Sequence, residues 1–301
     1  MKLLRKGKVK EVYEASPEEL EFVFTDQVSV FDKVIPSLVP HKGETLCRTS
    51  AHWFQVVGDL GIRTHFLRLT GPNRMRVRRV EVIPEYERIR ADTRNFLIPL
   101  EVIARYFVAG SLHDRIQAGR VLPESLGFPK GHVPAYGEEL AEPFLEVTTK
   151  LEKVDRELSR AEALRISSLS PKEYDDLLGT VLRIDGRLNA DVRRRGLIHV
   201  DGKKEFAMDP DRRIMLVDTF GTADEDRFWD LAAYEKGQQV ELSKEHVRQY
   251  YRNTGYHQAL MEARAAGRPE PDIPPLPDDV LREVSDLYVA LFERLTGGAF
   301  R

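Results

Sequence analysis

The sequence has a single cysteine, Cys47, among its 301 residues. One thiol forms no internal disulfide and supplies only one metal ligand, which excludes a disulfide-stabilised secreted domain and a cysteine-rich zinc site. Such sparing use of cysteine is typical of proteins that work in a reducing compartment. We interpret Cys47 as a small core residue and expect a cytoplasmic protein.

Long apolar runs and an excess of one charge are also missing. No segment approaches the roughly 20 apolar residues of a membrane-spanning helix, and the apolar part of "MKLLRKGKVK" is too short for a signal peptide. With 46 Lys plus Arg against 49 Asp plus Glu, the net charge of -3 gives no general attraction to nucleic acid or anionic lipid. We therefore expect no nucleic-acid or membrane partner, and any anion site has to be local.

Several well-known catalytic motifs are absent. The 8 histidines show neither HExxH nor HxH spacing, and there is no GxSxG, which argues against zinc and serine hydrolases. The glycine-containing segment "RKGKVKEVY" matches neither the GxxxxGK of P-loop proteins nor the GxGxxG of kinases.

What is present predicts a globular α+β protein of two lobes. A chain of 301 residues is long for one compact core, and 42% hydrophobic residues are enough to build cores. Period-two patterns predict hairpins at the N-terminus and strands in "THFLRL" and "MRVRRVEVIP", with a helix between Lys42 and Gly61. Pro84 and the charged run after it mark a joint. We expect a β-rich lobe over residues 1–84 and a larger α/β lobe over 85–301.

The second lobe is predicted from four patterns. We expect a strand in "LIPLEVIARYFVAGS", loops over residues 119–147, and a helix from about Lys172 that ends at "RRRG". "LIHVDGKKEFAMD" and "RIMLVDTF" predict a strand pair around the turn "DPDR", and helices are expected over Ser243–Ala265 and Pro277–Leu295.

Arg105 lies in the apolar stretch 97–111, and a guanidinium cannot lose its charge on burial. Its partner is either Glu101, which is about 13 Å away along a strand, or an anion held together with Ser111 at a helix N-terminus. We favour the anion. Arg227 either pairs with a nearby aspartate, Asp224 or Asp226, or forms a clamp with Arg105 for a phosphorylated and carboxylated small molecule.

Two further groups of residues could bind phosphate or metal. Lys8 and Lys10, beside Gly7, share one strand face and form either a phosphate cradle or a solvated basic hairpin. The segment "TDQVSVFDKVIP" places Asp32 in a loop and is uninformative by itself.

Glu205 and Asp218 are brought together by the predicted strand pair, with Lys203 on the same face as Glu205. They form either a site for Mg²⁺ that also holds phosphates, or a cross-strand salt-bridge network.

Six segments, in order, resemble the SAICAR synthetase family of purine biosynthesis. They are "GKVKEVY" (7–13), "TDQVSVFDKVIPSLVPHKGETLCRTSAHWF" (25–54), "LIPLEVIARYFVAGS" (97–111), "TTKLEKVD" (148–155), "DGKKEFAMD" (201–209) and "VDTFGTADEDRFW" (217–229). The resemblance implies a two-lobed fold with ATP in the cleft between the lobes. It implies an ATP- and Mg²⁺-dependent ligase that joins L-aspartate to the carboxylate of CAIR (carboxyaminoimidazole ribonucleotide), giving SAICAR, ADP and phosphate through an acyl phosphate. A homodimer is also possible.

The resemblance also implies roles for individual residues. The residues implied to bind ATP are Gly7, Lys8, Lys10, Lys203, Glu205 and Asp218, of which Glu205 and Asp218 also bind the metal. The residues implied to bind the substrates are Asp32, Arg105, Ser111, Lys150 and Arg227. The residues implied to take part in catalysis are Lys203, Glu205 and Asp218. The chain departs from the family pattern at Val154 and Glu157, where histidine and asparagine are usual, and at Lys204, Ala207 and Thr219. A related kinase or ligase with another acceptor and a non-catalytic nucleotide-binding module remain alternatives.

Overall fold

The computed structural model describes residues 1–301 and combines helices with sheets, as expected for an α+β protein. The strands are β1 (Lys2–Lys6), β2 (Lys10–Glu14), β3 (Glu19–Phe24), β4 (Gln27–Val30), β5 (Lys33–Leu38), β6 (Phe66–Gly71), β7 (Arg74–Arg78), β8 (Phe96–Phe107), β9 (Glu139–Thr149), β10 (Leu197–Met208), β11 (Ile214–Val217) and β12 (Asp226–Asp230). The helices are α1 (Lys42–Gly58), α2 (Gly110–Gln117), α3 (Arg160–Ser167), α4 (Pro171–Arg194), α5 (Leu231–Tyr234), α6 (Glu245–Asn253), α7 (Tyr256–Ala265) and α8 (Asp278–Thr296). Two 3-10 turns lie at Tyr86–Arg88 and Pro123–Leu126. None of the helices combines the length and apolar character that crossing a membrane requires.

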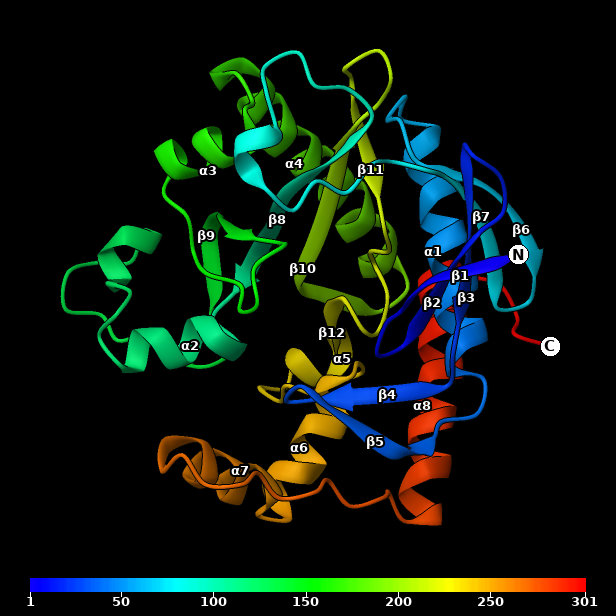
Figure 1. Ribbon diagram of the computed structural model, residues 1–301. Helices are drawn as coiled ribbons and strands as arrows, with labels where there is room; N and C mark the ends of the chain where they lie inside the picture. The colour runs from blue at the N-terminus through cyan, green and yellow to red at the C-terminus, as the bar shows by residue number, and fades with distance from the viewer.

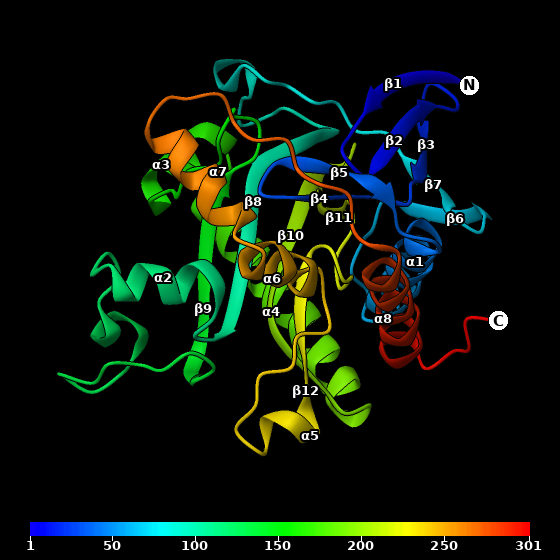
Figure 2. The ribbon, with the colours of Figure 1, turned by 90° about the horizontal axis from the view of Figure 1, so that it is seen from below.

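The N-terminal sheet has the strand order β1-β2-β3-β7-β6, and all its pairings are antiparallel. Helix α1 packs against β3, β6 and β7, and α8 from the end of the chain lies beside α1 (Figures 1 and 2). The largest apolar cluster contains 48 buried residues and extends from Phe22 to Leu295. One continuous core therefore joins both parts of the chain, and the division into residues 1–84 and 85–301 stays a prediction.

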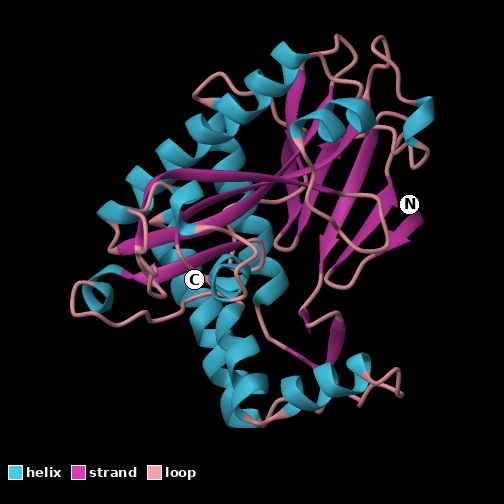
Figure 3. Cartoon of the chain, turned by 90° about the vertical axis from the view of Figure 1, so that its left-hand side faces the viewer, coloured by secondary structure: helices cyan, strands magenta, loops and turns pink.

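The second sheet has the strand order β11-β10-β8-β9, and β12 pairs with the first half of β10. Its strands run in a clearly different direction from those of the N-terminal sheet (Figure 3). Helix α4 packs on one face, where Leu177, Val181, Ile184 and Leu188 are fully buried. The opposite face carries the charged side chains described below.

Helix α4 confirms the prediction of a helix from about Lys172. Ser170 caps it: its hydroxyl accepts a hydrogen bond from the backbone N–H of Glu173, whose carboxylate accepts one from the N–H of Ser170. The helix ends beside Arg193 and Arg194, before Gly196 at φ 73°.

The prediction of loops over residues 119–147 is wrong in its last part, because β9 occupies Glu139–Thr149 and pairs with β8. Pro143 in "ELAEPFLEVTT" is unfavourable in a strand interior, since proline cannot donate a ladder hydrogen bond. β9 is the edge strand of its sheet, where proline is tolerated.

Other elements also differ from the expectations. "TDQVSVFDKVIP" is a hairpin rather than a loop: β4 and β5 pair around Phe31 and Asp32, which have φ of 52° and 66° without the Asn-Gly signal that usually marks such a turn. The helix expected over Ser243–Ala265 is divided into α6 and α7 before Gly255, whose φ of 79° ends α6. Helices α3 and α5 and strand β12 were not predicted.

A buried ionic network lies between β10 and α4. Lys204 is fully buried, and its ammonium lies 2.5 Å from Asp185 and 3.4 Å from Asp226. His199 lies 2.8 Å from Asp226, and the hydroxyl of Tyr106 donates to Asp185 at 2.9 Å. Lys204, one of the departures from the family pattern, therefore neutralises two buried aspartates.

Replacement of Lys204 by methionine leaves Asp185 and Asp226 buried without their cation. We expect Lys204→Met to lower the free energy of unfolding by about 3–5 kcal/mol, measured by urea denaturation. The matched control is Lys172→Met, because Lys172 is exposed and pairs with Asp176 on the surface; its loss should cost at most about 1 kcal/mol. Equal losses for the two variants would contradict this account.

Candidate functional site

The register of β8 against β10 places the charged side chains of the second sheet on one face. Glu101 lies opposite Glu205, and Arg105 lies opposite Asp201. Side chains alternate along a strand, so these residues and Lys203 point away from the neighbours that face α4. The site is therefore built on two paired strands of 12 residues each.

A lysine–carboxylate cluster occupies one end of this face and consists of Glu101, Lys150, Lys203, Glu205 and Asp218. The Lys150 ammonium lies 2.5 Å from Glu205 and 3.0 Å from Glu101. The Lys203 ammonium lies 3.0 Å from Glu101 and 3.4 Å from Glu205. Glu205 is 3% exposed, so both of its lysine partners offset the cost of burying a carboxylate.

Asp218 follows β11 and connects the two sheets through Lys10 of β2, whose ammonium contacts its carboxylate. The hairpin thus brings Glu205 and Asp218 together as the sequence predicts. Burial and the neighbouring Asp218 raise the pKa of Glu205 to about 7. Burial also disfavours ionisation of Asp218, but Lys10 and Lys150 outweigh it and lower the pKa of that carboxyl. The pair contains one readily ionised acid and one that titrates near neutrality.

Lys8 and Lys10 do not share one strand face. Lys8 lies in the turn before β2 and donates to Asp32 at 2.7 Å, whereas Lys10 belongs to β2 and contacts Asp218. The two ammonium groups therefore approach the site from different directions. The hydrogen bond from Lys8 is the main cause of the lowered pKa of Asp32.

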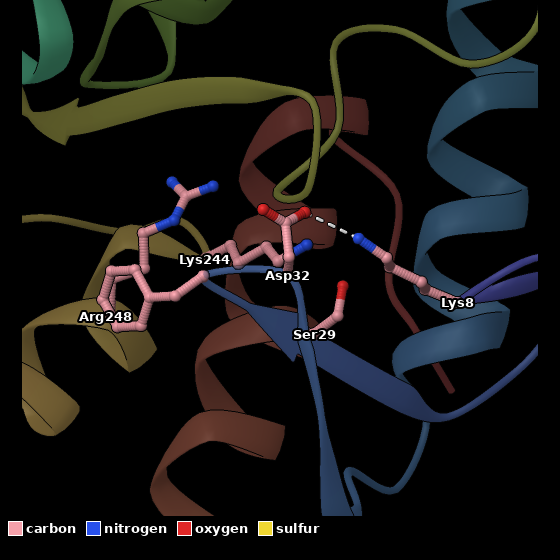
Figure 4. A pocket seen from close by; sticks show the side chains of 6 residues that line it. Lys8, Ser29, Asp32, Lys244 and Arg248 are labelled. Carbon is pink, nitrogen blue, oxygen red and sulfur yellow. Dashed lines mark hydrogen bonds and ion pairs between the residues drawn. The ribbon is translucent and has the colours of Figure 1, made fainter. Parts of the chain in front are cut away.

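A pocket of about 340 Å³ is lined by Lys8, Ser29, Phe31, Asp32, Lys244 and Arg248. Lys8 and Asp32 point toward one another in it, and Lys244 and Arg248 approach from the start of α6 (Figure 4). Burial lowers the pKa of Lys244, although Asp224 lies 3.7 Å away. The pocket joins the N-terminal hairpins to the C-terminal helices and has a net positive lining.

The Arg105–Asp201–Arg227 row crosses the other end of the charged face. Asp201 lies opposite Arg105 of β8 and Arg227 of β12, at 3.6 Å and 2.7 Å from their guanidinium groups. Arg105 also donates to Ser111 at 3.1 Å and contacts Glu146 of β9. The alternative ion pair between Arg105 and Glu101 does not form, because Glu101 belongs to the lysine–carboxylate cluster.

Arg227 pairs with neither Asp224 nor Asp226. Besides Asp201, it lies 3.6 Å from Glu241 and 3.5 Å from Glu245. Its guanidinium packs directly on Gly110 at the start of α2, where a Cβ atom would approach both terminal nitrogens to 2.7 Å. Arg105, Ser111 and Arg227 therefore converge at the N-terminal end of one helix.

A second pocket, of about 440 Å³, opens beside Arg105 and under α2. We name it the α2 pocket; its lining residues are Ile103, Arg105, Ser111, Arg115, Arg120, Glu146, Thr148, Asp155 and Glu157.

Sequence reasoning did not find Asp201, Glu146, Lys244 or Arg248 as members of the site. Asp201 could be found from the register of β8 against β10, because it lies opposite a predicted anion-binding arginine. Glu146 belongs to β9, the strand that is difficult to predict from the sequence because it contains Pro143. Lys244 and Arg248 have no local signal, because only the packing of α6 brings them to Lys8.

Glu241 lies behind Arg227 and is 8% exposed, where it accepts hydrogen bonds from Trp229 at 2.8 Å and Tyr136 at 3.1 Å. Burial, opposed in part by Arg227, raises the pKa of Glu241 from 4.5 to about 7. Because the folded state holds this proton to higher pH than the unfolded state, stability is lost as the pH rises from about 4.5 to about 7.

Glu241→Gln removes this titration. We expect the stability of the variant relative to the parent to increase by about 1–3 kcal/mol between about pH 5 and about pH 8, measured by urea denaturation at each pH. Glu235→Gln, at an exposed position, controls for the loss of one negative charge. A relative stability of Glu241→Gln that is constant with pH would contradict the expectation.

Comparison with known proteins identifies the family. A family model described as SAICAR synthetase matches residues 3–263. Phosphoribosylaminoimidazole-succinocarboxamide synthase of Thermoplasma acidophilum is 52% identical over 297 residues, which cover 99% of both chains. A putative synthase of the same name from Archaeoglobus fulgidus is 36% identical over 93% of this chain and 88% of its own.

Comparison with solved structures identifies the same family. A SAICAR synthetase in complex with ADP superposes with a TM-score of 0.70 at 25% identity over 99% of both chains. The Saccharomyces cerevisiae SAICAR synthase complexed with SAICAR shares the fold, with a TM-score of 0.76 at 23% identity over 99% of this chain and 95% of the other. The chain therefore belongs to the SAICAR synthetase family and is a ligase of purine biosynthesis.

Proposed function

We propose that the charged face of the second sheet is the active site of an ATP-dependent ligase that joins L-aspartate to the carboxylate of CAIR. One observation carries the proposal: the lysine–carboxylate cluster and the Arg105–Asp201–Arg227 row lie on the same face of β8 and β10, a few residues apart. A group suited to phosphoryl transfer and a group suited to a phosphorylated substrate are thus placed side by side on a rigid support.

The chemistry requires both groups. A carboxylate is a poor electrophile because its leaving group would be oxide, so its oxygen first attacks the γ-phosphorus of ATP, giving an acyl phosphate and ADP. The amine of aspartate then attacks the acyl carbon, the C–O bond to phosphate breaks, and the amine loses a proton. No protein nucleophile is needed, and catalysis rests on positioning and charge neutralisation.

The cations from the N-terminal sheet suit the ATP phosphates. Lys10 contacts Asp218 of the lysine–carboxylate cluster and Lys203 lies within the cluster, whereas Lys8 pairs with Asp32 in the pocket beside α6. Gly7 donates its backbone N–H to the carbonyl of Lys10, and a Cβ atom at this position would meet that carbonyl at 2.8 Å. Gly7 therefore permits the tight turn that presents Lys8.

Glu205 and Asp218 suit Mg²⁺, because carboxylate oxygens are its preferred protein ligands. Burial and the neighbouring Asp218 raise the pKa of Glu205, so a cation bound there would favour its ionised form. No group of three or more His, Cys, Asp or Glu side chains is arranged to hold a metal ion. Two carboxylates suffice where phosphate oxygens complete the shell. Mg²⁺ there would neutralise charge on the transferring phosphoryl group.

The ribonucleotide is assigned to Arg105, Ser111 and Arg227, with Asp32 and Lys150 nearer the reacting carboxylate. Two guanidinium forks and a hydroxyl at the start of α2 fit a phosphate group. Asp201, between the two arginines, is an acceptor suited to ribose hydroxyls. The cytoplasmic location and the homodimer remain predictions.

A coupled assay of ADP release tests the function. With CAIR, ATP and Mg²⁺ present, we expect turnover that depends on L-aspartate, with L-glutamate and L-asparagine as controls for the acceptor. Turnover with another amino acid alone would indicate a ligase of different specificity. ATP binding without turnover would indicate a nucleotide-binding module.

Gly110 offers a test of the ribonucleotide site. Gly110→Ala forces a methyl group against the Arg227 guanidinium, so we expect the KM for CAIR to rise about 10-fold or more while the KM for ATP stays unchanged. Gly119→Ala is the matched control, because Gly119 also has positive φ, 68° against 50° for Gly110, but no atom lies within 4 Å of the added methyl. Both variants should lose about 1–2 kcal/mol of stability from backbone strain. Equal KM values for CAIR in the two variants would refute the assignment of Arg227.

A further inference from the structure

Asp218 has an uncommon backbone conformation. Its φ of 59° lies in the left-handed region, where every side chain meets steric strain that glycine avoids. Residues in this conformation persist only where the surrounding structure holds them, and they are concentrated at functional sites. The contacts that hold Asp218 therefore decide where its carboxylate points.

The imidazole of His65 holds the backbone carbonyl of Asp218. Nε2 of the ring lies 3.2 Å from that oxygen, and because a carbonyl only accepts hydrogen bonds, Nε2 carries a proton and donates it. His65 is 2% exposed, so this hydrogen bond is shielded from water. The Lys10 ammonium contacts the carboxylate of the same residue. Asp218 is thus held at its main chain by His65 and at its side chain by Lys10.

The main chain of His65 is itself fixed on both sides. Its N–H donates to the carbonyl of Leu216 in β11 at 3.0 Å, and its carbonyl accepts from the N–H of Arg78 at 2.7 Å. The N–H of Leu216 donates in turn to the carbonyl of Arg63 at 2.9 Å, so this segment pairs with β11 along the edge that β10 leaves free. His65 therefore has a defined position between the N-terminal sheet and the second sheet.

The imidazole is packed against two aromatic rings. The centroid of the His65 ring lies 5.6 Å from that of Phe22 and 5.2 Å from that of Phe54. The Lys10 ammonium lies 4.3 Å from the centroid of the Phe22 ring, within the range of a cation–π contact. Phe22 thus contacts both groups that hold Asp218, which fixes the position of His65 relative to Lys10.

We propose that His65 is a positioning residue of the active site, whose Nε2–H keeps Asp218 in the left-handed conformation that directs its carboxylate into the lysine–carboxylate cluster. This inference rests on the proposed function, in which Asp218 and Glu205 are assigned to Mg²⁺. His65 acts only through the backbone of Asp218. Without the donor, relief of the strain moves the Asp218 carboxylate away from Glu205 and weakens the metal site.

Three substitutions separate the hydrogen bond of His65 from its packing. The amide nitrogen of glutamine is as many bonds from Cβ as Nε2 of histidine, whereas that of asparagine is one bond nearer. Only His65→Gln therefore keeps a donor that reaches the carbonyl of Asp218. His65→Leu fills the space without a donor, so a residue needed only for apolar packing would tolerate leucine better than glutamine.

The first measurement is calorimetry of ATP binding without CAIR or aspartate, in Mg²⁺ and in EDTA. We expect His65→Leu and His65→Asn to lose about 10-fold or more of the gain in affinity that Mg²⁺ gives the parent, with ATP binding in EDTA unchanged. His65→Gln should keep this gain to within about 2-fold. His52→Leu is the matched control and should resemble the parent, because His52 lies on α1 and its buried Nε2 has no hydrogen-bond partner.

The second measurement is hydrogen–deuterium exchange, which tests the positioning without the metal. The backbone amides from Asp218 to Gly221 should exchange about 10-fold faster in His65→Leu and His65→Asn than in the parent, because the hydrogen bond that restrains this segment is lost. His65→Gln should exchange like the parent. If His65→Leu does not fold, as judged by circular dichroism, His65→Asn against His65→Gln carries both measurements.

Several results would overturn the proposal. An unchanged Mg²⁺ effect in His65→Leu and His65→Asn would make His65 a core residue only, and so would failure of both variants to fold. An equal loss in His65→Gln would assign the effect to packing rather than to the hydrogen bond. A parent enzyme whose ATP affinity does not respond to Mg²⁺ would instead refute the metal assignment, and the exchange rates would still decide whether His65 holds Asp218.

Discussion

The antiparallel pairing of β8 with β10 is the constraint on which the site depends. A shift of this register by one residue would turn the charged side chains toward α4 and the apolar ones toward the site. The register is fixed because Val102 and Ala104 of β8 belong to the main apolar cluster with residues of α4. The same packing that stabilises the fold therefore sets which charges lie opposite one another.

Nearly every charge on this face has an opposite charge within contact distance. Lysines neutralise Glu101 and Glu205, and Asp201 lies between two arginines. Such pairing removes the charged groups from water, which costs free energy, so it adds little net stability by itself. Its value is geometric: ammonium and guanidinium groups that are already held in place need little reorganisation when phosphate and carboxylate groups arrive. Behind the sheet, the buried Lys204 gives the same kind of compensation to Asp185 and Asp226 without contact with the site.

Much of this arrangement could be predicted from local patterns. The strand around Arg105, the pair containing Glu205 and Asp218, and helix α4 follow from side-chain periodicity and turn residues, and the structure confirms them. Contacts between segments that are distant in the sequence are harder to predict. The partner of Arg105 is Glu146, on a strand whose proline and glutamates resemble a loop, and that of Lys8 is Asp32, in a turn formed without glycine or asparagine. Sequence periodicity reports which face a residue takes, but not which element will be packed against that face.

Pro143, which makes β9 difficult to predict from the sequence, also affects the outer edge of the sheet. β9 is an edge strand, and Pro143 removes one of the N–H groups that another strand would need in order to pair with it. Glu139 and Glu142 add exposed negative charge along the same edge. The sheet that carries the site therefore ends at β9, and its outer edge is protected against extension by a strand from another molecule, the step by which exposed edges begin to aggregate.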